Sequence, residues 1–183
     1  AVSFSAPANT CPRSTTTLTG APTGGTFSVV TAGGGTISGT TYTAPATAGT
    51  YTLRYDYTDA NTCTNFTTQP ITVNSKIGLT AMSFSSSTVC VGSTVTAQST
   101  PTGGTWSVLS GPGTINASTG IISPTGSTMI DVRYIHPGVS GTSCPDTEQG
   151  SITPLANPIP IMTSFSPAMC VNTSRALTGT TAA

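Results

Sequence analysis

Charged residues are nearly absent from this chain. Only 5% of its 183 residues are charged, with five basic and five acidic residues and a formal net charge of zero. The basic residues are scattered along the sequence: Arg13, Arg54, Lys76, Arg133 and Arg175. No basic face is therefore available to neutralise phosphates, and we expect no nucleic-acid partner.

Histidine and long apolar runs are also scarce. His136 is the only histidine, and no Cys-x-x-Cys spacing occurs. No apolar stretch approaches the roughly 18 residues that a membrane span requires. The sequence therefore predicts no membrane span, no metal site and no bound cofactor.

Threonine, glycine and proline are abundant instead. Threonine supplies roughly a fifth of the chain, beside 20 Gly and 14 Pro, and its β-branched side chain suits a half-exposed strand better than a helix. The 36% of apolar residues in ordered alternation argue against a disordered Ser/Thr-rich stalk. An uncharged, threonine-rich surface over alternating apolar residues is typical of a secreted β protein.

An internal repeat of about 80 residues sets the predicted domain organisation. The segment Pro22–Val29 (PTGGTFSV) returns as Pro101–Val108 (PTGGTWSV), at an offset of 79 residues. Ser-Phe-Ser at 3–5 recurs at 83–85 and at 164–166. We predict one module over residues 1–75, a second over 82–156, and the N-terminal portion of a third, incomplete module over 162–183. We expect the chain to be part of a longer protein; the alternative is that the third portion completes a neighbouring molecule's sheet.

The sequence of each module predicts short strands separated by turns, and no segment has the hydrophobic periodicity of a helix. In the first module we expect strands at Val2–Ser5, Thr15–Thr19, Thr26–Val30, Thr36–Ser38, Thr41–Thr43, Thr50–Tyr57 and Phe66–Val73. Alternation places Tyr51, Leu53, Tyr55 and Tyr57 on one face of the clearest strand. About seven strands per module predict an all-β fold of tandem immunoglobulin-like β-sandwich modules. The aromatic residues are expected on inward faces, with Phe27 and Trp106 anchoring equivalent positions of the two cores.

The five cysteines follow the repeat, since Cys11 corresponds to Cys90 and Cys170, and Cys63 to Cys144. We predict one disulfide in each full module, Cys11–Cys63 and Cys90–Cys144, with Cys170 unpaired. Closing each loop would contribute roughly 4 kcal/mol in the chain-entropy model and would imply an oxidising compartment. Other pairings stay open, because the first cysteine and the turn after the sixth strand lie at opposite ends of a seven-strand sandwich. Pairing of Cys63 with Cys90 and of Cys144 with Cys170 is also consistent with the repeat.

No catalytic constellation can be assembled from the residues present, and we predict that the chain is not an enzyme. A Ser-His-Asp arrangement would have to use His136, which stands where the first module has Tyr57 and is interpreted as a packing residue. Asp56 and Asp59 lie close together in an oxygen-rich segment of the sequence. Calcium binding by this segment is one interpretation. An Asx-type turn is favoured, because only two carboxylates are available.

Four segments carry a family resemblance: Ala48–Leu53 (AGTYTL), Thr58–Thr64 (TDANTCT), Cys90–Val95 (CVGSTV) and Pro101–Trp106 (PTGGTW). They resemble signatures of the Ig-like and PKD-like tandem repeats of long Bacteroidota cell-surface proteins, including SprB-type gliding adhesins. The resemblance implies export through an outer-membrane secretion system, an extracellular or cell-surface location, and a role as adhesin, stalk or surface filament. The chain departs from the signature at Thr62, where the family has glycine, and at 139–143, which replaces the Asp-Ala-Asn segment.

Three functions fit these observations. The first is a structural or adhesive repeat segment of an extracellular protein, whose partners are neighbouring modules or copies of the same protein in a fibre. The second is an Ig-like module that binds a surface glycan or protein. The third is a self-assembling filament subunit completed by strand exchange.

Overall fold

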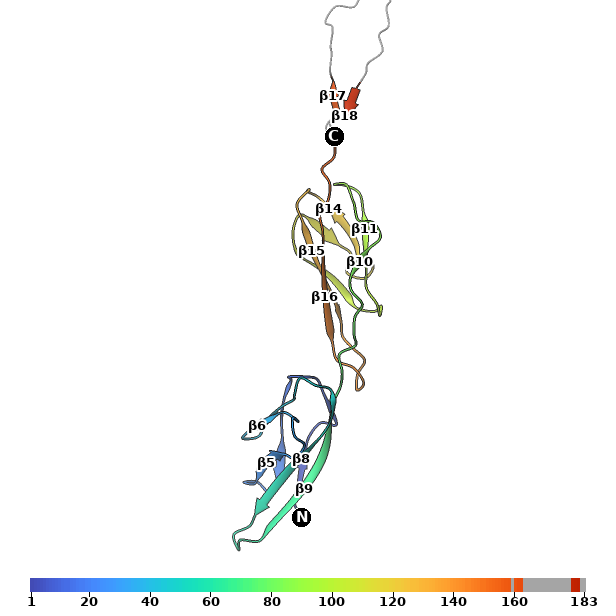
Figure 1. Ribbon diagram of the computed structural model, residues 1–183. Helices are drawn as coiled ribbons and strands as arrows, with labels where there is room; N and C mark the ends of the chain where they lie inside the picture. The colour runs from blue at the N-terminus through green and yellow to red at the C-terminus, as the bar shows by residue number, and fades with distance from the viewer. Residues whose placement is uncertain (159, 163–178, 182–183) are drawn as a thin grey trace, which may run out of the picture. The chain divides into compact units, whose positions relative to one another are not determined.

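Every regular element in the described part of the chain is a β-strand. The computed structural model describes residues 1–158, 160–162 and 179–181 (Figure 1). These residues pack as two compact units, one of residues 1–81, 99–105 and 134–148, and one of residues 82–98, 106–133 and those from 149 onward. The module limits at 1–75 and 82–156 stay a prediction. Most of the third portion at 162–183, including Cys170, lies outside the described residues.

The first repeat builds a four-stranded and a three-stranded sheet, with a further strand pair. The four-stranded sheet has the order β2-β9-β8-β5, from Asn9–Thr10, Thr64–Val73, Gly49–Thr58 and Thr26–Val29. The three-stranded sheet has the order β3-β7-β6, from Thr15–Thr17, Thr41–Thr43 and Thr36–Ser38. The pair is β1 (Ser3–Ser5) with β4 (Thr19–Ala21). Neighbouring strands run antiparallel except β2 and β9, which run parallel.

All seven strands expected in the first module are present, which confirms the all-β sandwich. The long hairpin of β8 and β9 pairs ten residues with ten, from Thr58 opposite Thr64 to Gly49 opposite Val73. Two elements were not expected. β2 has only two residues, too few to show an alternating pattern, and β4 begins at Thr19, the last residue of the strand predicted over Thr15–Thr19.

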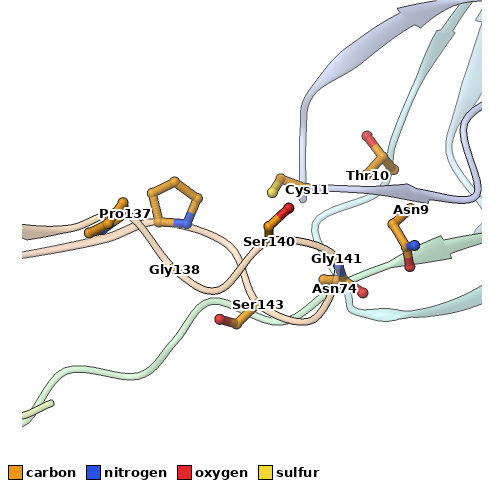
Figure 2. A pocket seen from close by; sticks show the side chains of 10 residues that line it. Asn9, Thr10, Cys11, Asn74, Pro137, Gly138, Ser140, Gly141 and Ser143 are labelled. Atoms are coloured by element: carbon orange, nitrogen blue, oxygen red, sulfur yellow. The ribbon is translucent and has the colours of Figure 1, made fainter. Parts of the chain in front are cut away.

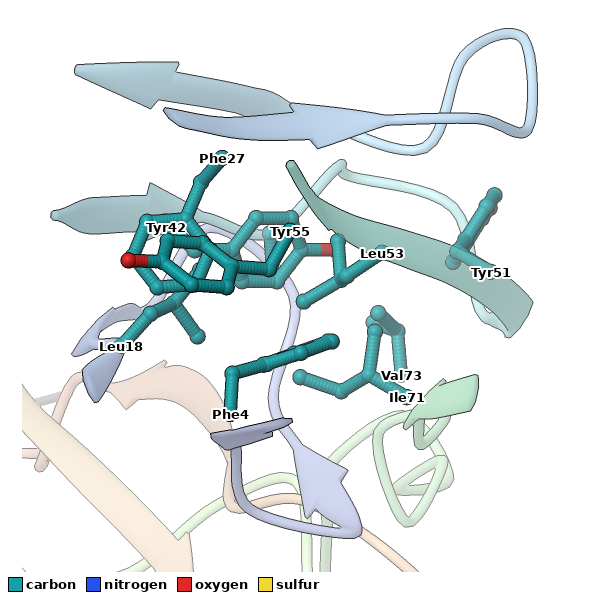
Figure 3. Packing of buried hydrophobic residues seen from close by; sticks show 10 residues of the cluster. Phe4, Leu18, Phe27, Tyr42, Tyr51, Leu53, Tyr55, Ile71 and Val73 are labelled. Atoms are coloured by element: carbon teal, nitrogen blue, oxygen red, sulfur yellow. The ribbon is translucent and has the colours of Figure 1, made fainter. Parts of the chain in front are cut away.

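The core of the first repeat is aromatic. Tyr51, Leu53 and Tyr55 project from β8 into this core, as the alternation predicts, and Leu53 is fully buried (Figure 3). The ring of Phe27 lies 4.5 Å from that of Tyr55, and Phe4 meets Phe27 edge-on at 5.7 Å. Burying side chains of this size contributes about 2 kcal/mol each, so this cluster dominates the stability of a module with short strands.

The second repeat also builds two sheets in which the equivalent strands pair in the same order, but none of its described strands corresponds to β2. One sheet has the order β12-β15-β16, from Thr105–Ser110, Ile130–His136 and Asp146–Ile152. The other has the order β10-β11-β14-β13, from Ser83–Phe84, Val95–Gln98, Ile121–Pro124 and Gly113–Ile115. Trp106 is buried as Phe27 is, which confirms the predicted equivalence of the two aromatic positions. Beyond the second repeat, β17 (Pro160–Met162) pairs with β18 (Gly179–Thr181).

A tyrosine hydroxyl closes the repeated Pro-Thr-Gly-Gly turn. The Tyr55 hydroxyl donates to the carbonyl of Pro22 at 2.5 Å and accepts the amide of Gly25 at 2.8 Å. A β-carbon on Gly25 would lie 2.3 Å from the Asp56 carbonyl, so only glycine allows this approach. The second repeat has the same arrangement at 2.9 and 2.7 Å, through Tyr134, Pro101 and Gly104.

Candidate functional site

One disulfide is present among the described residues, and it joins the two repeats. Cys11 of the first repeat is bonded to Cys144 of the second, 133 residues further along, with a Cα–Cα distance of 5.7 Å. Both residues belong to the first compact unit. The predicted pairs Cys11–Cys63 and Cys90–Cys144 are therefore wrong. Cys63 and Cys90 are free and exposed.

The length of β9 explains why the first module cannot close its own disulfide. Because β2 runs parallel to β9 with Thr10 beside Val73, Cys11 lies at the C-terminal end of β9. Cys63 precedes Thr64, at the opposite end of that ten-residue strand. At about 3.3 Å per residue the two cysteines are separated by roughly 30 Å, whereas a disulfide needs Cα atoms within about 7 Å.

Backbone hydrogen bonds hold Cys144 against the segment that leaves the first repeat. The Cys144 amide donates to the carbonyl of Ser75 at 2.8 Å, and the amide of Ile77 donates to the Cys144 carbonyl at 3.0 Å. Lys76 and Cys144 thus form a parallel bridge. The loop at 137–145, which follows β15, is in this way both covalently and non-covalently attached to the linker. We call the residues 74–79, Cys11 and 137–146 the junction.

An ion pair reinforces the junction. Lys76 Nζ lies 3.0 Å from Asp146 Oδ1, and the amide of Leu79 donates to Asp146 Oδ2 at 3.4 Å. The hydrogen bond from Lys76 is the main cause that lowers the pKa of Asp146, against a smaller opposing effect of burial. The Asp146 carboxylate is 17% exposed while Lys76 is 63% exposed, so solvent screens the pair and its contribution is below about 1 kcal/mol.

A small pocket lies beside the disulfide (Figure 2). Its walls come from the first repeat and from the loop at 137–145, and include Asn9, Thr10, Cys11, Pro137, Ser140 and Ser143. No carboxylate, imidazole or amine is among its lining residues, so nothing in its walls provides acid–base chemistry.

His136 is buried at the start of this loop, and both ring nitrogens make hydrogen bonds. Nδ1 accepts the amide of Gly138 at 3.0 Å, so the proton is assigned to Nε2, which donates to the carbonyl of Thr102 at 3.1 Å. The residue is 8% exposed. This agrees with its interpretation as a packing residue, and its position fixes where the loop leaves β15.

The two aspartates that suggested a calcium site have separate structural roles. Asp59 Oδ1 accepts the amides of Asn61 and Cys63, both at 2.9 Å, which confirms the Asx-type turn. Asp56 pairs instead with Arg54, whose Nε lies 2.9 Å from both carboxylate oxygens. In the described part of the chain no group of three His, Cys, Asp or Glu side chains is placed to hold a metal ion.

One aromatic residue departs from the expected inward placement. Phe66 on β9 is 54% exposed, and the guanidinium carbon of Arg54 lies 3.9 Å from its ring centroid. Alternation along β9 does place Phe66 on the outer face, because it lies an odd number of residues from the buried Ile71 and Val73 and pairs with Asp56 of β8.

Comparisons with known proteins give the chain no family. No protein-family model matches the sequence, and no curated protein matches it. Among solved structures, a C-terminal fragment of intimin in complex with the intimin-binding domain of its translocated receptor is similar at 13% identity and a TM-score of 0.35. The match covers 76% of this chain and 54% of the intimin fragment, so the chain spans about half of that fragment.

Cadherin-type structures are similar to the same degree. The extracellular domain of protocadherin γB4 matches at 12% identity with a TM-score of 0.31, over 91% of this chain and 35% of that one. Mouse cadherin-23 EC22–24 matches at 12% identity with a TM-score of 0.28, over 91% of this chain and 69% of that one. Among the described residues no helix has the length and apolarity to cross a membrane.

Proposed function

We propose that this chain is a load-bearing repeat segment of an extracellular surface protein, acting as an adhesive stalk or filament without an active site. The observation that supports the proposal best is the Cys11–Cys144 disulfide, because it links one repeat covalently to the next. A disulfide of this kind persists in an oxidising compartment, which supports an extracellular location. Neighbouring repeats and copies of the same protein are the proposed partners.

The residue inventory supports a passive role. The single histidine, His136, is buried and fully hydrogen-bonded, and the pocket beside the disulfide has no titratable wall. The Bacteroidota-type surface repeats that the sequence resembles are the proposed setting. Strand exchange through the third portion remains a second way to form a filament.

Single-molecule extension tests the load-bearing role. When the chain is pulled from its two ends, an intact Cys11–Cys144 bond prevents the segment between the two cysteines, which are 133 positions apart, from extending. Reduction should release an added contour length of about 450 Å, at roughly 3.4 Å per residue. The matched control is Cys63→Ser, which leaves the bond intact. If oxidised and reduced chains gain the same contour length when they unfold under force, the segment does not bear load through this bond and the proposal fails.

A binding role has one specific observation in its favour, the exposed Phe66 ring beneath Arg54. An exposed aromatic face is suited to stacking on a sugar ring or a partner side chain. Phe66→Ala should abolish binding to a glycan or protein array if this surface binds a ligand, and Val30→Ala, at another exposed apolar position on the same repeat, should not. Equal binding by wild type and Phe66→Ala would remove this alternative.

A further inference from the structure

The two free cysteines correspond, by the repeat, to the two bonded ones. Cys90 occupies the place of Cys11, and Cys63 occupies the place of Cys144. Cys11 and Cys144 form a disulfide, whereas Cys63 and Cys90 are exposed thiols. Each of the two repeated cysteine positions therefore has one bonded member and one free thiol.

Cys90 is held in the same turn as Cys11. In both repeats the cysteine carbonyl accepts the amide of the serine three residues later, at 3.2 and 3.0 Å. In both, the residue before that serine has positive φ, of 61° and 84°, and its amide donates to a proline carbonyl at 3.2 and 3.1 Å. These residues are Cys11, Arg13, Ser14 and Pro45 in the first repeat and Cys90, Gly92, Ser93 and Pro124 in the second.

Cys90 also lies beside the segment that leaves its own repeat, as Cys11 does. The amide of Asn74 donates to Thr10 at 2.9 Å, and the amide of Leu155 donates to Val89 at 2.8 Å. Asn74 begins the linker to which Cys144 is attached. Leu155, which bridges Cys90 directly, begins the corresponding segment after the second repeat.

Cys63 ends the turn between the two long strands of its repeat, as Cys144 does. Each turn has an amide that donates to the carbonyl three residues earlier, Thr62 to Asp59 and Thr142 to Val139, both at 3.0 Å, one residue before Cys63 and two residues before Cys144. The first repeat thus presents a loop cysteine of the type that is bonded in the second, at the end of the sandwich away from Cys11.

We infer that Cys63 and Cys90 are the open halves of further junction disulfides, whose partners are repeats of this same kind. Cys90 bonds the loop cysteine of a repeat that follows, and Cys63 bonds the turn cysteine of a repeat that precedes. The inference goes beyond the proposed function, because it depends on the repeat and on the observed bond and not on adhesion or load.

The bond forms by thiol–disulfide exchange. The thiolate of one cysteine attacks an external disulfide, such as oxidised glutathione, and releases one glutathione thiolate. The second cysteine then attacks the mixed disulfide and releases the other. Two cysteine thiols lose two electrons and two protons in total, and one external disulfide is reduced to two thiols.

The linker after the second repeat lacks the side chains that make the non-covalent contacts of the first junction, so the inferred disulfide is the contact that it keeps. Asn157 and Pro158 stand where the first linker has Lys76 and Ile77. The ion pair to Asp146 and the amide donated by Ile77 therefore have no counterpart there, since proline has no N–H group. The carbonyl of Ala156 still corresponds to that of Ser75, which accepts the Cys144 amide.

A tandem chain tests the inference. Residues 1–161 are followed directly by a second copy of 1–161, which keeps the register because Ser3 corresponds to Ser164. After oxidation with oxidised glutathione, non-reducing peptide mapping should find Cys11–Cys144 in each copy. It should also find a new bond from Cys90 of the first copy to Cys63 of the second. Maleimide labelling should then be lost from those two thiols and kept on the outer Cys63 and Cys90.

Two variants control the result. Cys90→Ser in the first copy should abolish the new bond, restore labelling of the second copy's Cys63, and leave both Cys11–Cys144 bonds intact. A three-repeat chain, residues 1–161 followed by 81–161, offers Cys90 the native loop at 137–145 and should form a Cys90–Cys144 bond to the added repeat. If Cys11–Cys144 forms while Cys90 stays reactive in both chains, or pairs elsewhere, the inference is overturned. Failure of the extension experiment with these bonds present would count against load-bearing alone.

Discussion

The hydroxyl of Tyr55 provides the sharpest test of how the repeated turn is stabilised. Tyr55 is 1% exposed and makes two hydrogen bonds to the turn, to Pro22 and from Gly25. Tyr55→Phe keeps the ring in the core and removes both bonds. At about 1 kcal/mol for each net hydrogen bond, we expect the free energy of unfolding of the first repeat to fall by about 2 kcal/mol.

Two neighbouring tyrosines on β8 form a graded control series. Tyr51 makes one hydrogen bond, to the carbonyl of Thr47 at 2.9 Å, so Tyr51→Phe should cost about 1 kcal/mol. Within the described residues the hydroxyl of Tyr57 has no hydrogen-bond partner, so Tyr57→Phe should cost less than about 0.5 kcal/mol. Losses that follow the number of hydrogen bonds would support the reasoning.

Urea unfolding followed by tyrosine near-ultraviolet circular dichroism measures these losses in the first repeat. The fluorescence of Trp106, which lies in the second repeat, reports whether the variants act locally. Hydrogen exchange adds a residue-level readout, because the Gly25 amide should exchange faster only in Tyr55→Phe. If Tyr55→Phe is as mild as Tyr57→Phe, the hydroxyl does not hold the turn and the reasoning is refuted.

Three further predictions concern Thr62, Gly25 and Asp146. Thr62 is a β-branched residue at a φ of 65°, so Thr62→Gly should stabilise the first repeat by about 1 kcal/mol in urea unfolding; a loss of stability would contradict this. Gly25→Ala would place a β-carbon 2.3 Å from the Asp56 carbonyl and should cost about 3 kcal/mol in the same assay, unlike Gly24→Ala, which meets no atom within 4 Å and is opposed only by its positive φ. Because the pKa of Asp146 is lowered on folding, its contribution is present above the unfolded carboxyl value of about 3.9 and is lost as pH falls through the folded value. The protection of the Leu79 amide relative to its intrinsic exchange rate should therefore fall as pH drops through the folded value, and Asp146→Asn should remove that dependence.

The fold was predictable because its signal is local. The alternation of Tyr51, Leu53 and Tyr55 with Thr52 and Arg54 assigns a face to each residue of β8 without any knowledge of the partner strands. The same holds for the Pro-Thr-Gly-Gly turn, whose glycines permit a geometry that other residues resist. The exposure of Phe66 was predictable on the same grounds, because it lies an odd number of residues from Ile71 and Val73; the expectation that aromatic residues face inward overlooked this parity.

The disulfide pairing shows what a repeat leaves undetermined. A period establishes that Cys11 and Cys90 are equivalent, but it is equally consistent with a partner in the same repeat, the one before or the one after. The three-dimensional structure removes this ambiguity through β2, which runs parallel to β9 and places Cys11 where the chain leaves the repeat. Cys63 lies at the other end of β9, roughly 30 Å away. A cysteine at the exit of one repeat and a cysteine in the turn at the entrance of the next are neighbours by connectivity, so the short bond is the one between consecutive repeats. Two residues of sequence, Asn9 and Thr10, form the strand that decides the pairing, and they carry too little pattern to be recognised before the structure is known.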